Sequence, residues 1–180
     1  IRLSLVGSEM CIRDRFTHPG GNLLFMGGEF GQSSEWNFQE SLEWHLTQYD
    51  FHSGIQETIK DLNKMYKSNP ALYQKQFKPD GFQWIEYNDQ ENTVISFIRK
   101  GNDPKDDLIV VCNFTPMPRE NYRLGVPKNS TLKLLFNSDD KKYSGSGIGK
   151  KTVKPSKTSW NGHEQSVLLN LPPLGVVVYK

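Results

Sequence analysis

Two hydrophobic patterns divide the chain near residue 75. On the N-terminal side, one stretch carries apolar residues at helical spacing, with intervals of 4, 3 and 4 residues between Ile55, Ile59, Leu62 and Tyr66. This spacing places the four side chains on one face, so it predicts an amphipathic helix with a single buried stripe. On the C-terminal side the apolar runs are short and closely spaced, which is typical of β-strands.

Signals at both ends support the helix. Ser53 and Gln56 match the S-x-x-Q capping box, in which each side chain bonds a free backbone N–H of the first turn. Asn69 is followed by Pro70, and a residue before proline is driven out of the helical conformation, so we expect the helix to end there.

A second apolar run lies upstream, at Leu23 to Met26, between glycine-rich flanks. Such a run predicts a buried strand that ends in a Gly-rich turn, as in parallel sheets covered on both faces. Residues 33–51 are polar and aromatic without a clean period, so we expect a long loop with at most one helical turn. Strand, loop and helix together make one β/α unit.

From about Phe77 onward the chain is a series of short runs rich in β-branched and aromatic residues, separated by turn signals. Seven such runs predict an antiparallel β-sandwich. Residues 138–162 are rich in Gly, Ser and Lys and are expected to form an exposed, mobile loop. The seven runs are GFQWIEY, TVISFIRK, DLIVVCNF, NYRLGV, LKLLFN, SVLLNL and LGVVVYK.

The first 15 residues, IRLSLVGSEMCIRDR, fit neither pattern. Glu9 and Arg13 interrupt the apolar stretch that a signal peptide needs, and Gly7 and Ser8 interrupt a helix. The string LVGSEMCIRD is what one frame of a common transposase sequencing adapter encodes. We therefore expect residues 1–15 to be translated adapter rather than native protein, with the native sequence starting near Phe16.

Composition excludes several classes of function. The 180 residues carry a net charge of +2, which gives no electrostatic footprint for nucleic acid or a membrane surface. No apolar run approaches the roughly 20 residues that span a bilayer. Cys11 and Cys112 are too few for a disulfide framework or a zinc site, which favours a reducing compartment, and Cys112 is expected in the core.

Several segments, in order and spacing, closely resemble the C-terminal part of bacterial 1,4-α-glucan (glycogen) branching enzymes, in the α-amylase superfamily (glycoside hydrolase family 13). The resemblance implies a mixed fold, with the last β/α unit of a truncated (β/α)8 barrel at 16–75 and an all-β antiparallel sandwich at 76–180. A whole barrel needs about 250 residues. The segments are LLFMGGEFGQSSEWNFQESLEWHL, IKDLNKMYKSNPAL, GFQWIEY, VVCNFTPMPRENYRLGVP, NSDDKKYSGSG and LPPLGVVVYK.

The same resemblance implies a retaining transglycosylase that cuts an α-1,4 link in amylose or glycogen and re-attaches the piece through an α-1,6 link. It implies no metal or organic cofactor, and a cytoplasmic, monomeric parent enzyme. The family uses three carboxylates in motifs that this sequence does not contain. We therefore expect all three upstream of Phe16, carry over no catalytic residue, and expect this chain alone to be inactive.

Three residues after the predicted strand are candidates for substrate contact or for orienting catalytic groups. Glu29 lies at the barrel face where active sites form, and its alternative role is a structural partner of a backbone N–H or an Arg. Glu35 with Glu29 could suggest a glycosidase pair, which the resemblance argues against. Trp36 is a candidate wall for a glucan subsite or a packing residue of the loop.

Aromatic residues of the β domain have mostly structural expectations. Four of them are expected to pack in the core or between domains: Trp84, Phe82, Phe97 and Tyr122. Trp160 is either an exposed glucan contact or, more simply, a hydrophobic anchor for its loop.

Two alternatives stay open: a non-catalytic glucan-binding β-sandwich, or the C-terminal part of another superfamily enzyme, debranching or trehalose-forming. Without the rest of a barrel, residues 16–70 are expected to expose apolar surface and to be less stable than the sandwich. A protease-resistant core is then expected to start near residue 75.

Overall fold

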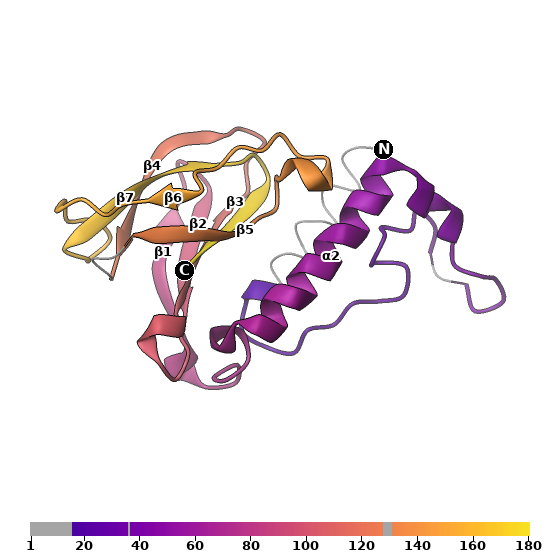
Figure 1. The fold of residues 1–180 in the computed structure, drawn as a ribbon, viewed down its shortest axis with the longest axis horizontal. Coiled ribbons are helices and arrows are strands. Elements are labelled where there is room, and N and C mark those ends of the chain that lie inside the picture. Colours follow the sequence, from indigo (N-terminus) through magenta and orange to yellow (C-terminus); the bar gives the residue numbers. More distant parts are fainter. Residues whose placement is uncertain (1–15, 36, 128–130) are drawn as a thin grey trace.

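The structure, a computed structural model, describes residues 16–35, 37–127 and 131–180. A six-stranded antiparallel sheet, ordered β1-β2-β3-β8-β5-β6, forms its centre. A two-stranded sheet, β4-β7, packs on one face of it, and the long helix α2 lies along the other face (Figure 1). The strands are β1 (Phe82–Asp89), β2 (Val94–Arg99), β3 (Leu108–Asn113), β4 (Arg119–Val126), β5 (Leu132–Asn137), β6 (Thr152–Val153), β7 (Gln165–Leu171) and β8 (Gly175–Tyr179). The helices are α2 (Asp50–Ser68) and the 3-10 turns η1 (Trp44–Gln48), η2 (Pro70–Leu72), η3 (Pro79–Gly81), η4 (Pro104–Asp106) and η5 (Lys141–Tyr143).

The central strands are buried on both faces. Every residue of β3 is buried, and alternate side chains belong to different cores. Leu108, Val110 and Cys112 pack with α2, whereas Ile109 and Val111 pack against β4 and β7. Because both faces are covered, the strand is a continuous apolar run rather than an alternating one. The expectation that Cys112 is a core residue is confirmed.

The amphipathic helix is confirmed, and its stripe packs on the β domain. Ile55, Ile59 and Leu62 are at most 6% exposed, and with Met65 they join the core that contains the α2-facing residues of β2, β3, β5 and β8. The stripe is therefore covered without any barrel helix or strand beside it.

The capping box is wrong, because the helix begins earlier than its signal. Tyr49 is the N-cap and makes no side-chain cap hydrogen bond. The Ser53 N–H already donates to the Tyr49 carbonyl at 3.0 Å, and its hydroxyl donates to the Asp50 carbonyl at 3.1 Å. Ser53 thus lies inside the first turn, where its backbone is satisfied. The helix ends before Asn69, as expected.

The expected strand at Leu23 to Met26 is wrong. Among the described residues no strand precedes β1, and Leu23 is 73% exposed. A strand takes its backbone hydrogen bonds from a neighbour, and the described part of the chain places no strand beside this run. The Gly-rich turn that follows is confirmed, since Gly27 has φ +84° and the Gly28 N–H donates to the Phe25 carbonyl at 2.9 Å.

All seven expected β-strands are present, and an eighth lies in the segment expected to be a mobile loop. Residues 138–162 contain η5 and β6, and Tyr143 and Val153 are buried there. The Asp139 carboxylate accepts two backbone N–H groups of this segment, at 2.9 and 3.1 Å. The polar composition therefore serves internal hydrogen bonds, and the expectation of a wholly exposed loop is wrong.

Candidate functional site

The Gly-rich turn lies on the side of α2 away from the sandwich (Figure 1) and borders a hollow of about 410 Å³. Glu35 lines this hollow together with the turn, and its side chain is exposed. Glu29 lies in the turn, half-buried, and is not among the lining residues. Trp36 lies outside the described residues. The structure thus brings Glu35 to a concave surface and places Glu29 beside it.

A third carboxylate in this region, Glu43, has a defined structural role that the sequence did not indicate. Its Oε2 accepts hydrogen bonds from the Ser33 N–H, the Ser33 hydroxyl and the Ser34 N–H, at 3.1, 3.0 and 3.2 Å. The hydrogen bond from the Ser34 N–H has the largest effect and lowers the pKa of Glu43. Burial opposes it more weakly, and the other serine hydrogen bonds lower the pKa further, so it lies below its usual value. This carboxylate closes the loop that follows the Gly-rich turn.

A cluster of aromatic side chains, which we call the β1 platform, lies on β1 and its neighbour β2. It consists of Trp84 and Tyr87, supported by His18, Phe82 and Phe97. Trp84 is 41% exposed and Tyr87 is 70% exposed. The Trp84 ring stands edge-on to Phe82, with ring centroids 4.8 Å apart and an interplanar angle of 90°. The Tyr87 ring lies 6.1 Å from that of Trp84.

A register shift explains how Trp84 and Tyr87 come to the same side. In a regular strand, residues three apart point to opposite faces. The pairing of β1 with β2 is irregular between Trp84 and Glu86, and one additional residue in a strand turns the following side chains to the other face. Trp84 is therefore not buried in the core, and its packing between domains stays a prediction. A bulge cannot be seen in the hydrophobic pattern.

The β1 platform has the character of a carbohydrate-binding surface. The face of an aromatic ring packs well on the C–H groups of a pyranose, and an uncharged sugar needs no counter-ion. Phe82 and Phe97 both contact the Trp84 ring in edge-on geometry and restrict its rotation. Binding a ligand on this ring therefore costs little side-chain entropy.

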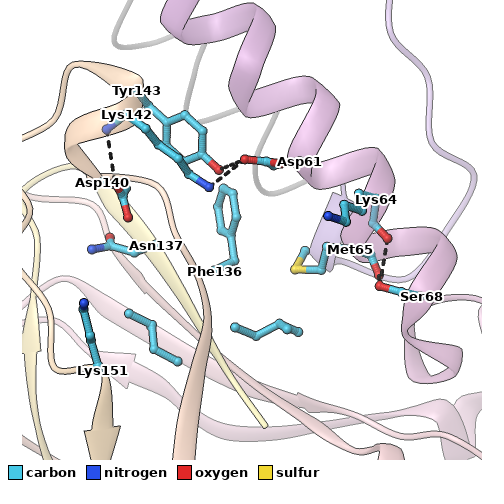
Figure 2. A pocket seen from close by; sticks show the side chains of 12 residues that line it. Asp61, Lys64, Met65, Ser68, Phe136, Asn137, Asp140, Lys142, Tyr143 and Lys151 are labelled. Atoms are coloured by element: carbon cyan, nitrogen blue, oxygen red, sulfur yellow. Dashed lines mark hydrogen bonds and ion pairs between the residues drawn. The ribbon is translucent and has the colours of Figure 1, made fainter.

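A second hollow, of about 430 Å³, lies between α2 and β5 (Figure 2). At its upper end Asp61 of α2 accepts hydrogen bonds from Lys142 Nζ and the Tyr143 hydroxyl, both at 2.7 Å. Partial burial works to raise the pKa of Asp61, but these two hydrogen bonds and the charge of Lys142 outweigh it and lower that pKa. The cluster fastens η5 to the helix.

Arg99, at the end of β2, is buried and has no carboxylate partner among the described residues. Its guanidinium donates to the Thr17 carbonyl at 2.7 Å and the Leu72 carbonyl at 3.1 Å. Burial lowers the pKa of Arg99 to about 10. The Arg99 side chain therefore links two segments to β2: the one before the Gly-rich turn and the one after α2.

Two searches confined to the described ranges bear on other kinds of site. No group of three or more His, Cys, Asp or Glu side chains there is placed to hold a metal ion. None of the helices in those ranges has the length and apolar character to cross a membrane.

Comparison with known proteins gives a family and close relatives. Residues 84–180 match the family described as "Alpha amylase, C-terminal all-beta domain". The 1,4-alpha-glucan branching enzyme GlgB of Aquifex aeolicus (strain VF5) is 49% identical over 166 residues, covering 92% of this chain and 26% of that protein. The enzyme of the same name from Rhodospirillum rubrum is 46% identical over 165 residues, covering 92% of this chain and 22% of that protein. The chain thus spans about a quarter of the length of these relatives.

Solved structures share the fold. The crystal structure of Ttha1563 from Thermus thermophilus has a TM-score of 0.69 at 18% identity, covering 99% of this chain and 32% of that one. A pullulanase from Anoxybacillus sp. LM18-11 has a TM-score of 0.60 at 12% identity, covering 99% of this chain and 23% of that one. At such identities the likeness concerns the fold alone. The family match covers more than half of the chain, including every strand from β2 to β8, so the chain belongs to the alpha amylase C-terminal all-beta domain family.

Proposed function

We propose that this chain is the C-terminal part of a 1,4-α-glucan branching enzyme that acts on amylose and glycogen in the cytoplasm. Residues 16–75 then belong to the end of the catalytic barrel and residues 76–180 form the β domain. Identities of 43–49% to proteins with that name, over at least 90% of the chain, support the proposal. The family of the β domain is consistent with it.

The surface of residues 22–48 supports the assignment to a larger enzyme. Met26 and Trp44 are 49% and 50% exposed, and the Gly-rich turn borders an open hollow. Exposed apolar side chains gathered on one segment mark a surface that another part of a protein covers. The remainder of a barrel is the partner that the proposed function supplies.

The proposed chemistry divides between this chain and the rest of the enzyme. The carboxylates that form and resolve the glycosyl-enzyme belong to the upstream part of the barrel. Glu29, Glu35 and Trp36 are proposed as residues beside that site, contacting the glucan or orienting catalytic groups. Glu35 is the best placed of the described pair, because it lines the hollow.

The observation that carries the role of the β domain is the β1 platform. Trp84 and Tyr87 present exposed ring surface on the edge strand of the large sheet. We propose that the platform holds the polysaccharide while the barrel acts on one of its chains.

A chimera tests the enzymatic assignment. Residues 16–180 would replace the corresponding C-terminal part of the Aquifex aeolicus relative, and branching of amylose would be followed by the fall in iodine absorbance. The proposal expects the chimera to branch amylose, and the 180-residue chain alone to leave the colour unchanged. A well-folded, inactive chimera would count against the assignment, and activity of the chain alone would refute the upstream location of the carboxylates.

A binding experiment tests the β1 platform and the competing idea of a stand-alone binding module. Trp84→Ala should weaken amylose binding to the chain about tenfold, which corresponds to about 1.4 kcal/mol, whereas Phe77→Ala should not. Phe77 is 82% exposed and is not part of the platform. Equal binding by both variants would remove the platform from the proposal. An inactive chimera with intact binding would favour the stand-alone module.

A further inference from the structure

A two-residue hairpin before β7 holds a half-exposed tryptophan in a fixed position. Asn161 and Gly162 have φ of +48° and +74°, the signature of a type I′ turn, for which Asn-Gly is the preferred pair. The Trp160 N–H donates to the His163 carbonyl and the His163 N–H donates to the Trp160 carbonyl, both at 2.9 Å. Trp160 is nevertheless 48% exposed.

The hairpin is fastened to two strands by one side chain. Asn161 Oδ1 accepts the Gly125 N–H of β4 at 2.9 Å, and its Nδ2 donates to Glu86 Oε2 of β1 at 2.8 Å. Gly125 has no room for a side chain, because a Cβ there would lie 2.1 Å from the Trp160 carbonyl oxygen. The backbone that carries Trp160 is therefore rigid and held close against β4.

The position of the hairpin relates it to the β1 platform. Glu86, which bonds Asn161, lies two residues along β1 from Trp84, and β1 is the edge strand of the large sheet. The segment leading into β7 lies at the end of the sandwich remote from α2 (Figure 1). Trp84 packs on Phe97 of the core under α2, whereas Asn161 is bonded to β4 on the opposite face of the sheet. A polysaccharide that bends around the β1 edge can therefore meet both the platform and the hairpin.

We propose that Trp160 is a second contact for an α-glucan chain, used together with the β1 platform by ligands long enough to reach both. The proposal rests on the proposed function, which supplies the glucan. The Asn161 side chain is engaged in the clamp, so the exposed Trp160 ring is the surface offered to a ligand, and an aromatic face suits an uncharged sugar. Burial lowers the pKa of His163, which keeps this neighbour neutral at neutral pH.

Ligand length gives the proposal a distinctive signature. Two weak contacts on one chain reinforce each other because the second forms intramolecularly. A short sugar can occupy only one of them. Loss of Trp160 should therefore weaken the binding of a long glucan far more than the binding of a short one.

The test compares binding of amylose and maltotriose to the 180-residue chain by titration calorimetry. Trp160→Leu keeps apolar bulk for anchoring the loop but removes the aromatic face, and it should weaken amylose binding about fivefold and maltotriose binding less than twofold. Trp160→Tyr should restore most of the amylose affinity. Asn161→Gly keeps the turn but loses the clamp, and it should give an intermediate loss. Trp44→Ala, at a tryptophan of matched exposure on η1, is the control and should change nothing.

The outcomes separate this inference from the proposed function. If Trp160→Leu binds amylose like the wild type while Trp84→Ala does not, the hairpin contact is refuted and the platform stands. If amylose fails to bind the wild type, both contacts are refuted, and only the chimera then bears on branching. If Trp160→Leu and Trp160→Tyr lower the melting temperature and the affinity together, Trp160 is an anchor of its loop, and the proposed contact is refuted.

Discussion

Helix α2 and the segment that precedes it lie side by side in the chain and differ sharply in how they are held. Leu62 of α2 is fully buried and Ile55 is 2% exposed, whereas Met26 and Tyr49 are 49% and 56% exposed. The helix packs on the large sheet, on the face opposite to β4-β7. Helix α2 therefore packs in the core of the β domain, although it follows a barrel-like motif in the sequence.

The difference shifts the expected stability boundary. The sequence predicted weak structure over residues 16–70 and a resistant core from residue 75. The sheet face under α2 would expose Val110 and Val178 if the helix left it, so helix and sheet should unfold together. We therefore place the boundary near Asp50.

Limited proteolysis should give the largest contrast. Sites within residues 21–48 should be cut at least about a hundredfold faster than sites in α2, because local opening there breaks few buried contacts. Mass spectrometry of the surviving core should find its N-terminus between residues 45 and 55. A core that starts near residue 75 would restore the boundary predicted from the sequence and detach α2 from the sandwich.

Truncating one apolar side chain in each region should affect the free energy of unfolding very differently. Leu62→Ala removes a fully buried side chain between helix and sheet and should lower the free energy of unfolding by about 2–5 kcal/mol. Met26→Ala, in the exposed turn, should change it by less than about 0.5 kcal/mol. Urea denaturation measures both. Similar losses in the two variants would mean that Met26 is packed as tightly as Leu62, although only Phe16 and Leu24 upstream of α2 join the described core with it.

The smallest effect concerns the fastening of η5 to α2. The folded-state pKa of Asp61 is lowered, so its contribution is present above the ordinary value of 3.8 and is lost as pH falls through the folded pKa. Asp61→Asn should therefore cost about 1 kcal/mol at pH 7 and less at pH 2. Urea midpoints at the two pH values test this. A cost that persists in full at pH 2 would point to packing rather than to the charge.

The pattern of apolar residues was sufficient to predict α2, from its helical spacing, and seven of the eight described strands, from their short runs between turn signals. It failed at Leu23 to Met26, since a strand also needs a neighbour to bond, and a linear pattern does not show one. The run LIVVCN did hold a clue to the position of α2. An uninterrupted apolar strand implies cover on both faces, and a two-sheet sandwich alone covers only one.

The candidate binding residues were harder to predict. Trp84 was expected to pack because it lies in an apolar run, and only the irregular pairing of β1 explains why Tyr87 joins it at the surface. The Asn161-Gly162 pair is a recognisable hairpin signal that was hidden inside a segment expected to be a loop. Its clamp on β1 and β4 joins residues far apart in sequence, which no local pattern reveals.

The place of β8 in the sheet has a consequence for how the chain is made. This strand pairs with β3 on one side and β5 on the other, yet it follows α2 by about 100 residues of translation, which take roughly 5–20 s at typical ribosome rates. During that interval the apolar stripe of α2 has no complete sheet to cover. The helix can therefore bury this stripe against the complete sheet only after β8 has been synthesised.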